Sequence, residues 1–408
     1  MKTFDVPIIY RSPLISAIKK KRKEEDRLKK DFSPTFLDFG PLRIYLARHF
    51  GFCYGVENAI DIAFKTVEDN KDKRIFLLSE MIHNPQVNAD LENSGVSFLQ
   101  DTSGRQIIPF EDLTNNDIVL IPAFGTTLEI EKKLQRIGIN IEKYDTTCPF
   151  VEKVWNRSEA IANNNYTIII HGKPTHEETR ATFSHAAVNA PSVVVRDMDQ
   201  AKDLAQYILG KKPAKQFYID FKSQYSEGFN VEKHLQRIGV VNQTTMLASD
   251  TQAIADFLKE TMIKKFNLGE GEIKEHFADT RDTLCYATND NQTAVVGMLG
   301  VKADLAIVVG GSNSSNTSHL VELCEEKLQT FYISDSDKII SDHTILHYDF
   351  HTKMELITEN YLPKKEPLTI LITSGASCPD ALVEGVIKKL AGFYSGKTID
   401  EVMNEFIV

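Results

Sequence analysis

Three of the five cysteines in the sequence lie at a predicted helix start that opens a new unit of the chain. Cys148 follows residues 139–144, in which isoleucines alternate with polar residues as in a half-buried strand. It precedes Pro149, which suits the first turn of a helix, and apolar residues then recur at helical spacing. A helix N-terminus carries unpaired N–H groups and about half a positive charge, so it favours a thiolate or another anion. Cys148 is therefore a candidate metal ligand or reactive thiol.

Cys53 and Cys285 repeat this arrangement, each about a domain away from Cys148 along the chain. Cys53 follows the apolar stretch 42–47 and opens a predicted helix over residues 55–64. Cys285 follows residues 273–282 and opens a helical run of its own. Three cysteines in one local setting predict three similar units that face one shared point.

The other two cysteines have different surroundings. Cys324 lies within a helical run and is expected to fill the core. Cys378 also lies at a predicted helix start, but it follows Ser377 in a serine-rich turn, so we expect a bystander. Three converging thiolates without an obvious fourth suit an iron–sulfur cluster with one open iron. A three-cysteine zinc site is the alternative, although the closely spaced cysteine pairs of structural zinc sites are missing. A Cys/His hydrolase would leave two thiolates unexplained.

Composition limits the broad class of the protein. The chain has 408 residues, enough for two to three domains, and it is 42% apolar and 25% charged, as in ordinary globular proteins. Scattered cysteines in odd number do not indicate a disulfide framework. The net charge of −10 argues against non-specific nucleic-acid binding. No run is long enough to span a membrane, and Asp5 and Pro7 interrupt the N-terminal segment, so a cytoplasmic location is expected.

Short apolar runs alternate with helical patterns from Leu42 onward, which predicts α/β architecture with parallel sheets covered by helices. The expected strands are at residues 75–78, 118–122, 166–172, 192–195, 239–245, 305–309 and 368–372. Ser249 and Gln252 form a predicted capping box for a helix that ends near Phe266. We expect an N-terminal extension (1–41) and three lobes (42–147, 148–284 and 285–408), with an insertion at 211–237. The basic run 19–27 is expected to be a solvated helix, with a docking patch for an acidic partner as the alternative.

Polar residues gather at the ends of the predicted strands, where α/β sheets bind ligands. These segments are rich in hydroxyl, amide and imidazole groups, and each precedes a plausible helix: residues 79–85, 171–178, 242–245, 310–319 and 373–380. The glycine-rich stretch 310–318 is not a P-loop, because it lacks the Gly-Lys-Ser/Thr ending. Together these segments predict a pocket for a phosphate ester or diphosphate.

Several motifs, in order, resemble the 4-hydroxy-3-methylbut-2-enyl diphosphate reductase (LytB/IspH) family. The resemblance runs from about Leu42 to Leu390, and the long form resembles the plant and cyanobacterial branch. The motifs are Gly51-Phe52-Cys53-Tyr54-Gly55-Val56, Ile82-His83-Asn84-Pro85, Thr146-Thr147-Cys148-Pro149, His176-Glu177-Glu178-Thr179, Asn242-Gln243-Thr244-Thr245, Cys285-Tyr286-Ala287-Thr288, Ser312 to His319 and Thr373 to Ser377.

The resemblance implies a trefoil of three α/β lobes around a [4Fe–4S] cluster held by Cys53, Cys148 and Cys285. The fourth iron would bind the hydroxyl oxygen of the substrate. Reductive removal of this hydroxyl would give isopentenyl and dimethylallyl diphosphate, with two electrons from ferredoxin or flavodoxin. Glu178 is the expected proton donor, relayed through Thr244, with His176 close by. The resemblance also implies substrate contacts at the following residues: His83, His176, Thr244, Ser314, Ser315, Asn316 and Ser377.

One position departs from the family pattern. The short bacterial form has a histidine where this chain has Phe124. A phenylalanine cannot donate a hydrogen bond to phosphate, so Phe124 is left out of the expected site. Two other functions stay open. One is a hydro-lyase, similar to quinolinate synthase, in which the cluster acts only as a Lewis acid. The other is a cluster-binding sensor without catalysis.

Overall fold

The computed structural model describes residues 4–269, 271–278 and 283–407. The chain forms two compact units. The first unit contains residues 1–61, 82–88 and 286–408, and the second contains residues 62–81 and 89–285. The division falls within helices α2 (Tyr54–Asp69) and α3 (Pro85–Asn93). No helix among the described residues has the length and hydropathy needed to cross a membrane.

A five-stranded sheet forms the centre of the first unit, in the order β1-β2-β13-β9-β10. Strand β1 (Thr35–Asp38) is antiparallel to β2 (Leu42–Leu46), whereas β2, β13 (Leu368–Ser374), β9 (Leu305–Val309) and β10 (Thr330–Ile333) are mutually parallel. A hairpin of β11 (Thr344–Asp349) and β12 (Met354–Glu359) forms a separate two-stranded sheet. The carboxyl ends of β2, β13 and β9 lead into the loops that carry Cys53, Ser377 and Ser314.

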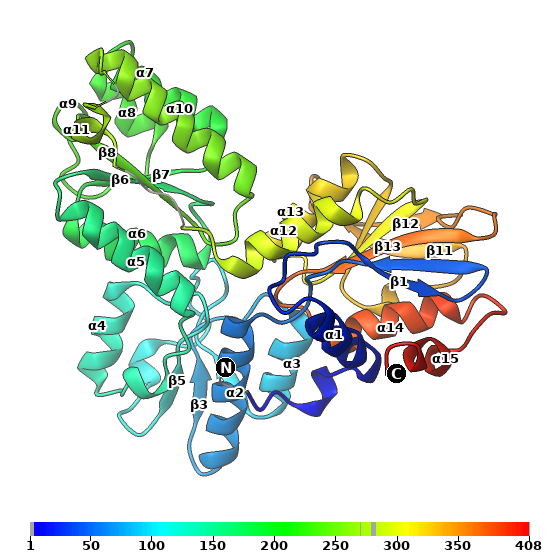
Figure 1. The fold of residues 1–408 in the computed structure, drawn as a ribbon. Coiled ribbons are helices and arrows are strands. Elements are labelled where there is room, and N and C mark those ends of the chain that lie inside the picture. Colours follow the sequence, from blue (N-terminus) through cyan, green and yellow to red (C-terminus); the bar gives the residue numbers. More distant parts are fainter. Residues whose placement is uncertain (1–3, 270, 279–282, 408) are drawn as a thin grey trace. The chain divides into compact units, whose positions relative to one another are not determined.

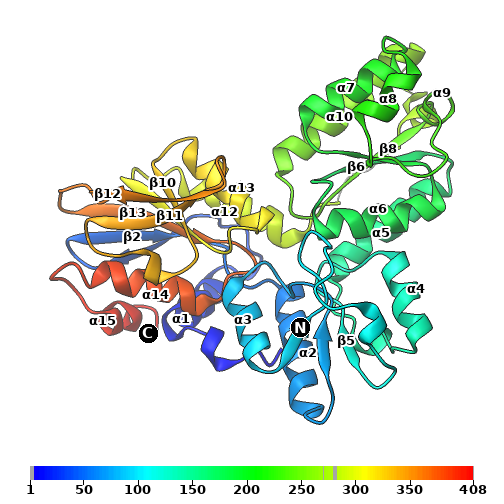
Figure 2. The same ribbon diagram turned by 180° about the vertical axis from the view of Figure 1, so that it is seen from behind.

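Alternate residues of this sheet enter two different cores, because successive side chains of a strand point to opposite faces. In β9, Leu305, Ile307 and Val309 join one core and Ala306 and Val308 the other. The first core is completed by α14 (Asp380–Ala391), α15 (Ile399–Asn404) and α1 (Pro13–Glu25). The second core is completed by α12 (Tyr286–Met298) and α13 (Ser315–Glu325). Figures 1 and 2 show these two sets of helices on opposite faces of the sheet.

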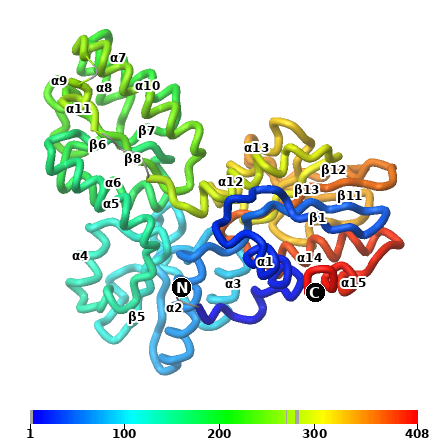
Figure 3. Tube along the Cα trace, in the orientation of Figure 1, coloured from blue at the N-terminus to red at the C-terminus, as the bar shows by residue number. Residues whose placement is uncertain are grey.

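Helix α1 is part of the first core, although its sequence is dominated by a basic run. Ser12 caps the helix by accepting a hydrogen bond from the N–H of Ile15 (2.9 Å). Leu14, Ile15 and Ile18 are buried in the core. Figure 3 shows the blue α1 beside the red α14 and α15. Residues before Leu42 therefore belong to the first unit, and only one side of α1 is solvated.

Two three-stranded parallel sheets lie in the second unit. One has the order β4-β3-β5 and consists of β4 (Val96–Phe98), β3 (Ile75–Leu77) and β5 (Ile118–Leu120). The other has the order β7-β6-β8 and consists of β7 (Ser192–Val195), β6 (Thr167–His171) and β8 (Ile238–Asn242). Helices α5 (Pro149–Ala162) and α6 (Glu177–Asn189) cover one face of the latter sheet, and α7 (Met198–Ile208) and α10 (Ala248–Phe266) cover the other (Figure 1). The expected α/β class with parallel sheets is confirmed.

The stretch 211–237 is helical in part and well packed, although its sequence is polar and weakly periodic. It contains α8 (Ala214–Asp220) and α9 (Val231–His234). The rings of Phe221 and Phe229 each stack on Phe217, and all three are buried in the core between α7, α10 and the sheet. The remaining elements are α4 (Leu128–Ile137), α11 (Ile273–His276), η1 (Ile8–Tyr10), η2 (Phe110–Asp112), η3 (Glu142–Tyr144) and η4 (Ser336–Lys338).

Three local predictions are wrong. Residues 139–144 form no strand: η3 occupies their second half, and Ile121 forms an isolated bridge with Asp145, the residue that follows this range. Residues 273–276 form the short helix α11 in place of a strand, and 279–282 lie outside the described residues. The capping box at Ser249 is absent, because α10 begins at Ala248 with Leu247 as its N-cap and no side-chain cap.

Candidate functional site

Cys148 is the N-cap residue of α5. Its carbonyl oxygen accepts hydrogen bonds from the N–H groups of Val151 (2.8 Å) and Glu152 (3.2 Å), and its side chain is partly exposed. Burial raises the pKa of the Cys148 thiol to about 12, and the charges of Cys285 and Glu178 add to the increase. A cation bound to the sulfur would reverse this effect, because it stabilises the thiolate. Cys148, Cys285 and Glu178 are therefore near enough to interact within the second unit.

Cys285 directly precedes α12 and lies beside the end of β8. Its backbone N–H donates a hydrogen bond to the carbonyl oxygen of Thr244 (3.4 Å). The side chain of Cys285, like that of Cys148, is partly exposed. Thr244 follows the carboxyl end of β8, which is the edge of a parallel sheet where ligands bind.

Glu178 and Thr244 form a buried hydrogen-bonded pair. One carboxylate oxygen of Glu178 accepts the backbone N–H of Thr244, and the other accepts its hydroxyl group (3.0 Å). Glu178 is 1% exposed and Thr244 is 4% exposed. A carboxyl group in this position has a fixed orientation and can exchange a proton with the threonine hydroxyl. The predicted pairing of these two residues is thus present in the structure.

His176 is the N-cap residue of α6, and its Nδ1 atom accepts a hydrogen bond from the N–H of Glu178 (3.2 Å). This bond makes Nδ1 an acceptor, so in the neutral ring the Nε2 atom carries the proton. The ring of Phe124 packs edge-on against the imidazole, with centroids 5.7 Å apart. Phe124 therefore packs against His176.

Cys53 lies in the first unit, in the loop between β2 and α2. Its backbone N–H donates a hydrogen bond to the carbonyl oxygen of Ala376 (3.2 Å), and its carbonyl oxygen accepts one from the N–H of Glu57 (2.9 Å). The side chain is partly exposed. The cysteine loop is thus joined directly to the turn that contains Ser377.

Three predicted substrate-binding segments meet in the first unit. The hydroxyl group of Ser377 donates to the carbonyl oxygen of His83 (3.1 Å), and the side-chain oxygen of Asn316 accepts the N–H of Ala376 (2.9 Å). Ser314 caps α13 by accepting the N–H of Thr317 (3.2 Å). The segments therefore place hydroxyl and amide groups around a helix N-terminus, which favours an anion.

Two glycines permit this close approach. A Cβ atom on Gly311 would lie 2.5 Å from the carbonyl oxygen of His83, and one on Gly375 would lie 2.0 Å from the Thr317 hydroxyl oxygen. Either atom would push the neighbouring segments apart. The close packing of these turns thus depends on glycine, which has no Cβ atom, at both positions.

The predicted site residues fall into two groups, one in each unit. His83, Ser314, Ser315, Asn316, Ser377 and Cys53 belong to the first unit, and Glu178, His176, Thr244, Cys148 and Cys285 belong to the second. Within the described ranges, no three or more His, Cys, Asp and Glu side chains form a group that could hold a metal ion. The three-cysteine ligand set and the roles of the other residues remain predictions.

Cys324 and Cys378 differ from the other three cysteines by their complete burial. Both are 0% exposed and each belongs to an apolar core of the first unit. Burial raises the pKa of the Cys324 thiol to about 12, and burial likewise raises the pKa of Cys378. These environments are those of core fillers.

Several contacting residues were not singled out from the sequence. The hydroxyl group of Thr317 bonds to that of Ser314 (2.9 Å) in the serine-rich turn. Buried Glu177, next to Glu178, accepts a hydrogen bond from the hydroxyl group of Ser79. Thr317 and Glu177 lie inside motifs rich in polar residues. Both side chains are buried, and the sequence does not show this burial.

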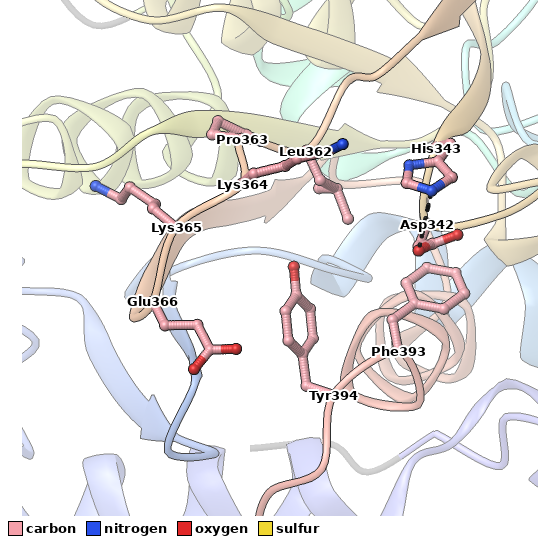
Figure 4. A pocket seen from close by; sticks show the side chains of 9 residues that line it. All are labelled: Asp342, His343, Leu362, Pro363, Lys364, Lys365, Glu366, Phe393 and Tyr394. Atoms are coloured by element: carbon pink, nitrogen blue, oxygen red, sulfur yellow. Dashed lines mark ion pairs between the residues drawn. The ribbon is translucent and has the colours of Figure 1, made fainter.

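A separate pocket of about 360 Å³ opens elsewhere in the first unit (Figure 4). Its walls are Asp342, His343, residues 362–366, Phe393 and Tyr394. Figure 4 shows the ion pair between Asp342 and His343 at 3.6 Å. None of the predicted site residues lines this pocket, and most of its walls are solvent-exposed side chains.

The comparisons with known proteins agree with the motifs. The family model described as LytB protein matches residues 44–391. The chain is 39% identical over 382 residues to 4-hydroxy-3-methylbut-2-enyl diphosphate reductase of Picosynechococcus sp., covering 93% of this chain and 89% of the relative. It is 42% identical over 356 residues to the enzyme of the same name from Prochlorococcus marinus, covering 86% and 85%.

Solved structures show a similar fold. The chain matches the E-1-hydroxy-2-methyl-but-2-enyl-4-diphosphate reductase from Plasmodium falciparum with a TM-score of 0.61 and 21% identity, over 91% of this chain and 98% of that one. A second solved structure, described as (E)-4-hydroxy-3-methyl-but-2-enyl diphosphate reductase, the terminal enzyme of the non-mevalonate pathway, has a TM-score of 0.50 and 24% identity, over 86% and 99%. With the family model matching most of its length, the chain belongs to the LytB protein family.

Proposed function

We propose that this protein is a 4-hydroxy-3-methylbut-2-enyl diphosphate reductase. The reaction takes the allylic alcohol, two electrons and two protons, breaks the carbon–oxygen bond, and releases water with isopentenyl or dimethylallyl diphosphate. This is the terminal step of the non-mevalonate pathway. The observation that carries the proposal is the buried Glu178–Thr244 pair in the same unit as Cys148 and Cys285, in a chain whose relatives carry this activity in their names.

We propose a [4Fe–4S] cluster held by Cys53, Cys148 and Cys285. The donor set fits this group: three partly exposed thiols, each directly before a helix, where backbone N–H groups favour anionic sulfur. Within the first unit, the N–H of Tyr54 donates to the hydroxyl group of Tyr286, and these are the residues that follow Cys53 and Cys285. When bound, such a cluster supplies electrons and a Lewis acid for the departing oxygen.

Glu178 is the proposed proton donor. Its two oxygens are engaged by the backbone and hydroxyl groups of Thr244, so a proton can pass through the hydroxyl to a departing oxygen. His176 caps the helix that carries Glu178, which supports a role in holding its orientation. Both residues are on the carboxyl side of the sheet, at the N-terminus of α6.

The diphosphate is proposed to bind the joined turns of the first unit. Ser314, Ser315 and Asn316 surround the start of α13, and His83 and Ser377 flank it through their mutual hydrogen bond. Hydroxyl and amide donors at a helix N-terminus attract phosphate oxygens without a large excess of cationic side chains. Thr317 joins this set through its bond to Ser314.

The proposal extends to the wider arrangement. The three lobes 42–147, 148–284 and 285–408 would form a trefoil around the cluster. Ferredoxin or flavodoxin would supply the electrons, and the enzyme would work in the cytoplasm.

The decisive test is an anaerobic assay of purified holoprotein, with dithionite as the reductant and the hydroxylated diphosphate as the substrate. We expect both five-carbon diphosphates, and we expect the Ser314→Ala/Asn316→Ala variant to need a much higher substrate concentration. A holoprotein with a full iron content that releases no reduced product would refute the reductase. Loss of water without consumption of reductant would favour the hydro-lyase.

A further inference from the structure

Residues 11–30 differ in charge from the rest of the chain. They contain nine lysines and arginines and three acidic residues, a net charge of +6, whereas the whole chain has a net charge of −10. A basic surface on an acidic protein attracts partners that the remainder of the protein repels. Part of this segment is the helix α1 and part is the turn that follows it.

The outer face of this segment carries cations without partners. Lys20, Lys23, Arg27 and Lys30 are exposed, and we call these four residues the basic patch. Lys20 and Lys23 are three residues apart in α1, a spacing that places side chains on one side of a helix, and Arg27 and Lys30 lie in the segment that follows the helix. Throughout the described chain, no carboxylate forms an ion pair with any of the four, whereas Lys19 pairs with Asp380 (2.8 Å).

The inner face of α1 packs against the loop that leads to Cys53. The Lys19 ammonium lies 4.9 Å from the centroid of the Phe50 ring, and the carbonyl oxygen of Arg22 accepts a hydrogen bond from Arg48 (3.4 Å). Before the helix, the ring of Tyr10 lies edge-on to Phe52, with centroids 5.9 Å apart. The basic patch therefore lies on the outside of the elements that hold this loop.

The turn after α1 reaches the other side of the same loop. Lys29 lies 5.9 Å from the centroid of the Tyr286 ring. The hydroxyl group of Tyr286 accepts the N–H of Tyr54, the residue after Cys53. Tyr286 is 37% exposed, so a partner on the basic patch would have an aromatic surface beside it that leads to the cysteine loop.

We infer that the basic patch is the docking surface for a small acidic electron-transfer protein, which delivers electrons on the Cys53 side of the first unit. The inference rests on the proposed function, because that reaction consumes two electrons. Two one-electron carriers are each oxidised once. Their two electrons and two protons break the carbon–oxygen bond of the substrate: one proton ends in the new carbon–hydrogen bond, and the other leaves in water with the hydroxyl group. Interfaces between electron-transfer proteins bury little surface, and their association depends on electrostatic steering, which this basic surface provides.

The test compares two charge-reversal variants of the holoenzyme. One is Lys20→Glu/Lys23→Glu/Arg27→Glu. The matched control is Lys211→Glu/Lys215→Glu/Lys222→Glu, which changes exposed lysines of the second unit and alters the net charge equally. Turnover is measured at low ionic strength with a reduced acidic ferredoxin and, separately, with dithionite. Binding of the oxidised ferredoxin is measured by titration.

We expect kcat/KM for the ferredoxin to fall at least about tenfold in the patch variant, with weaker binding and an unchanged dithionite rate. The control variant and the charge-preserving Lys20→Arg/Lys23→Arg variant should behave like the original protein. Equal ferredoxin kinetics in the patch variant and the original protein would overturn the docking surface while leaving the reductase intact. Equal losses in the patch and control variants would also overturn it, because only net charge would then matter. If the original holoprotein gives no product even with dithionite, the proposed function fails and the docking surface fails with it.

Discussion

Replacing Glu178 by glutamine removes the proposed proton donor with little change of shape. The carboxylate accepts two hydrogen bonds from Thr244, one from its N–H and one from its hydroxyl group. The glutamine oxygen can still accept the N–H of Thr244, and the glutamine NH2 group can donate to the Thr244 hydroxyl oxygen, but an amide cannot serve as the acid. Loss of a general acid lowers the rate by roughly 10²–10⁴-fold. We therefore expect Glu178→Gln to lower kcat by this factor, while iron content and substrate binding stay close to those of the original protein.

Variants of Thr244 separate the hydroxyl group from the carboxylate. A hydrogen bond to a charged group contributes about 1.5–3 kcal/mol, so Thr244→Val should lower kcat by roughly 10- to 150-fold. Thr244→Ser retains the hydroxyl and should keep most of the turnover. Single-turnover rates with dithionite measure the chemical step directly. A Glu178→Gln enzyme with full iron and unchanged kcat would refute the role of this residue.

The remaining predictions concern the core, the glycine turn and pH. Ile15→Ala should lower the free energy of unfolding by about 2–5 kcal/mol in a urea titration, because Ile15 is buried in the core. The control Ile8→Ala, at an 84% exposed residue, should change this free energy by less than about 0.5 kcal/mol. Equal effects of the two variants would exclude α1 from the core. Gly375→Ala should raise KM for the diphosphate about 10²-fold, because its Cβ atom would displace Thr317, and an unchanged KM would exclude this turn from the site. Burial lowers the pKa of His49 from 6.5 to about 4, so unfolding between these pH values takes up a proton, and stability should decline as the pH falls from about 6.5 towards 4. The urea midpoint of the His49→Gln variant should fall less over this range. Equal declines in the variant and the original protein would contradict this cause.

Most parallel strands and several helices were predictable because their patterns are local. The apolar residues of β2 and β9 and the helical spacing in α2 and α5 reflect burial of one face, and the structure has these four elements within a few residues of their predicted bounds. The strands β1, β4, β10, β11 and β12 were not predicted. The pairing of Glu178 with Thr244 was expected from the resemblance to the reductase family, and in the structure the two residues follow neighbouring parallel strands.

Other features depend on contacts that sequence patterns do not contain. Ile139 and Ile141 lie in an irregular segment, yet both side chains are buried in the core. Alternating isoleucines can therefore be buried without forming a strand. Phe217 lies in α8 and Phe221 is its C-cap residue, and this helix is too short to show a clear period. The join between Ser377 and His83 links residues almost 300 positions apart, and only the fold reveals it.

The cluster ligands are tested most directly by the iron content of single cysteine variants, prepared and kept without oxygen. Serine at position 53, 148 or 285 should remove most of the iron, whereas alanine at Cys324 or Cys378, the two fully buried cysteines, should leave about four irons per chain. Full iron in any of the three serine variants, or loss of iron in the Cys378→Ala variant alone, would contradict the proposed ligand set.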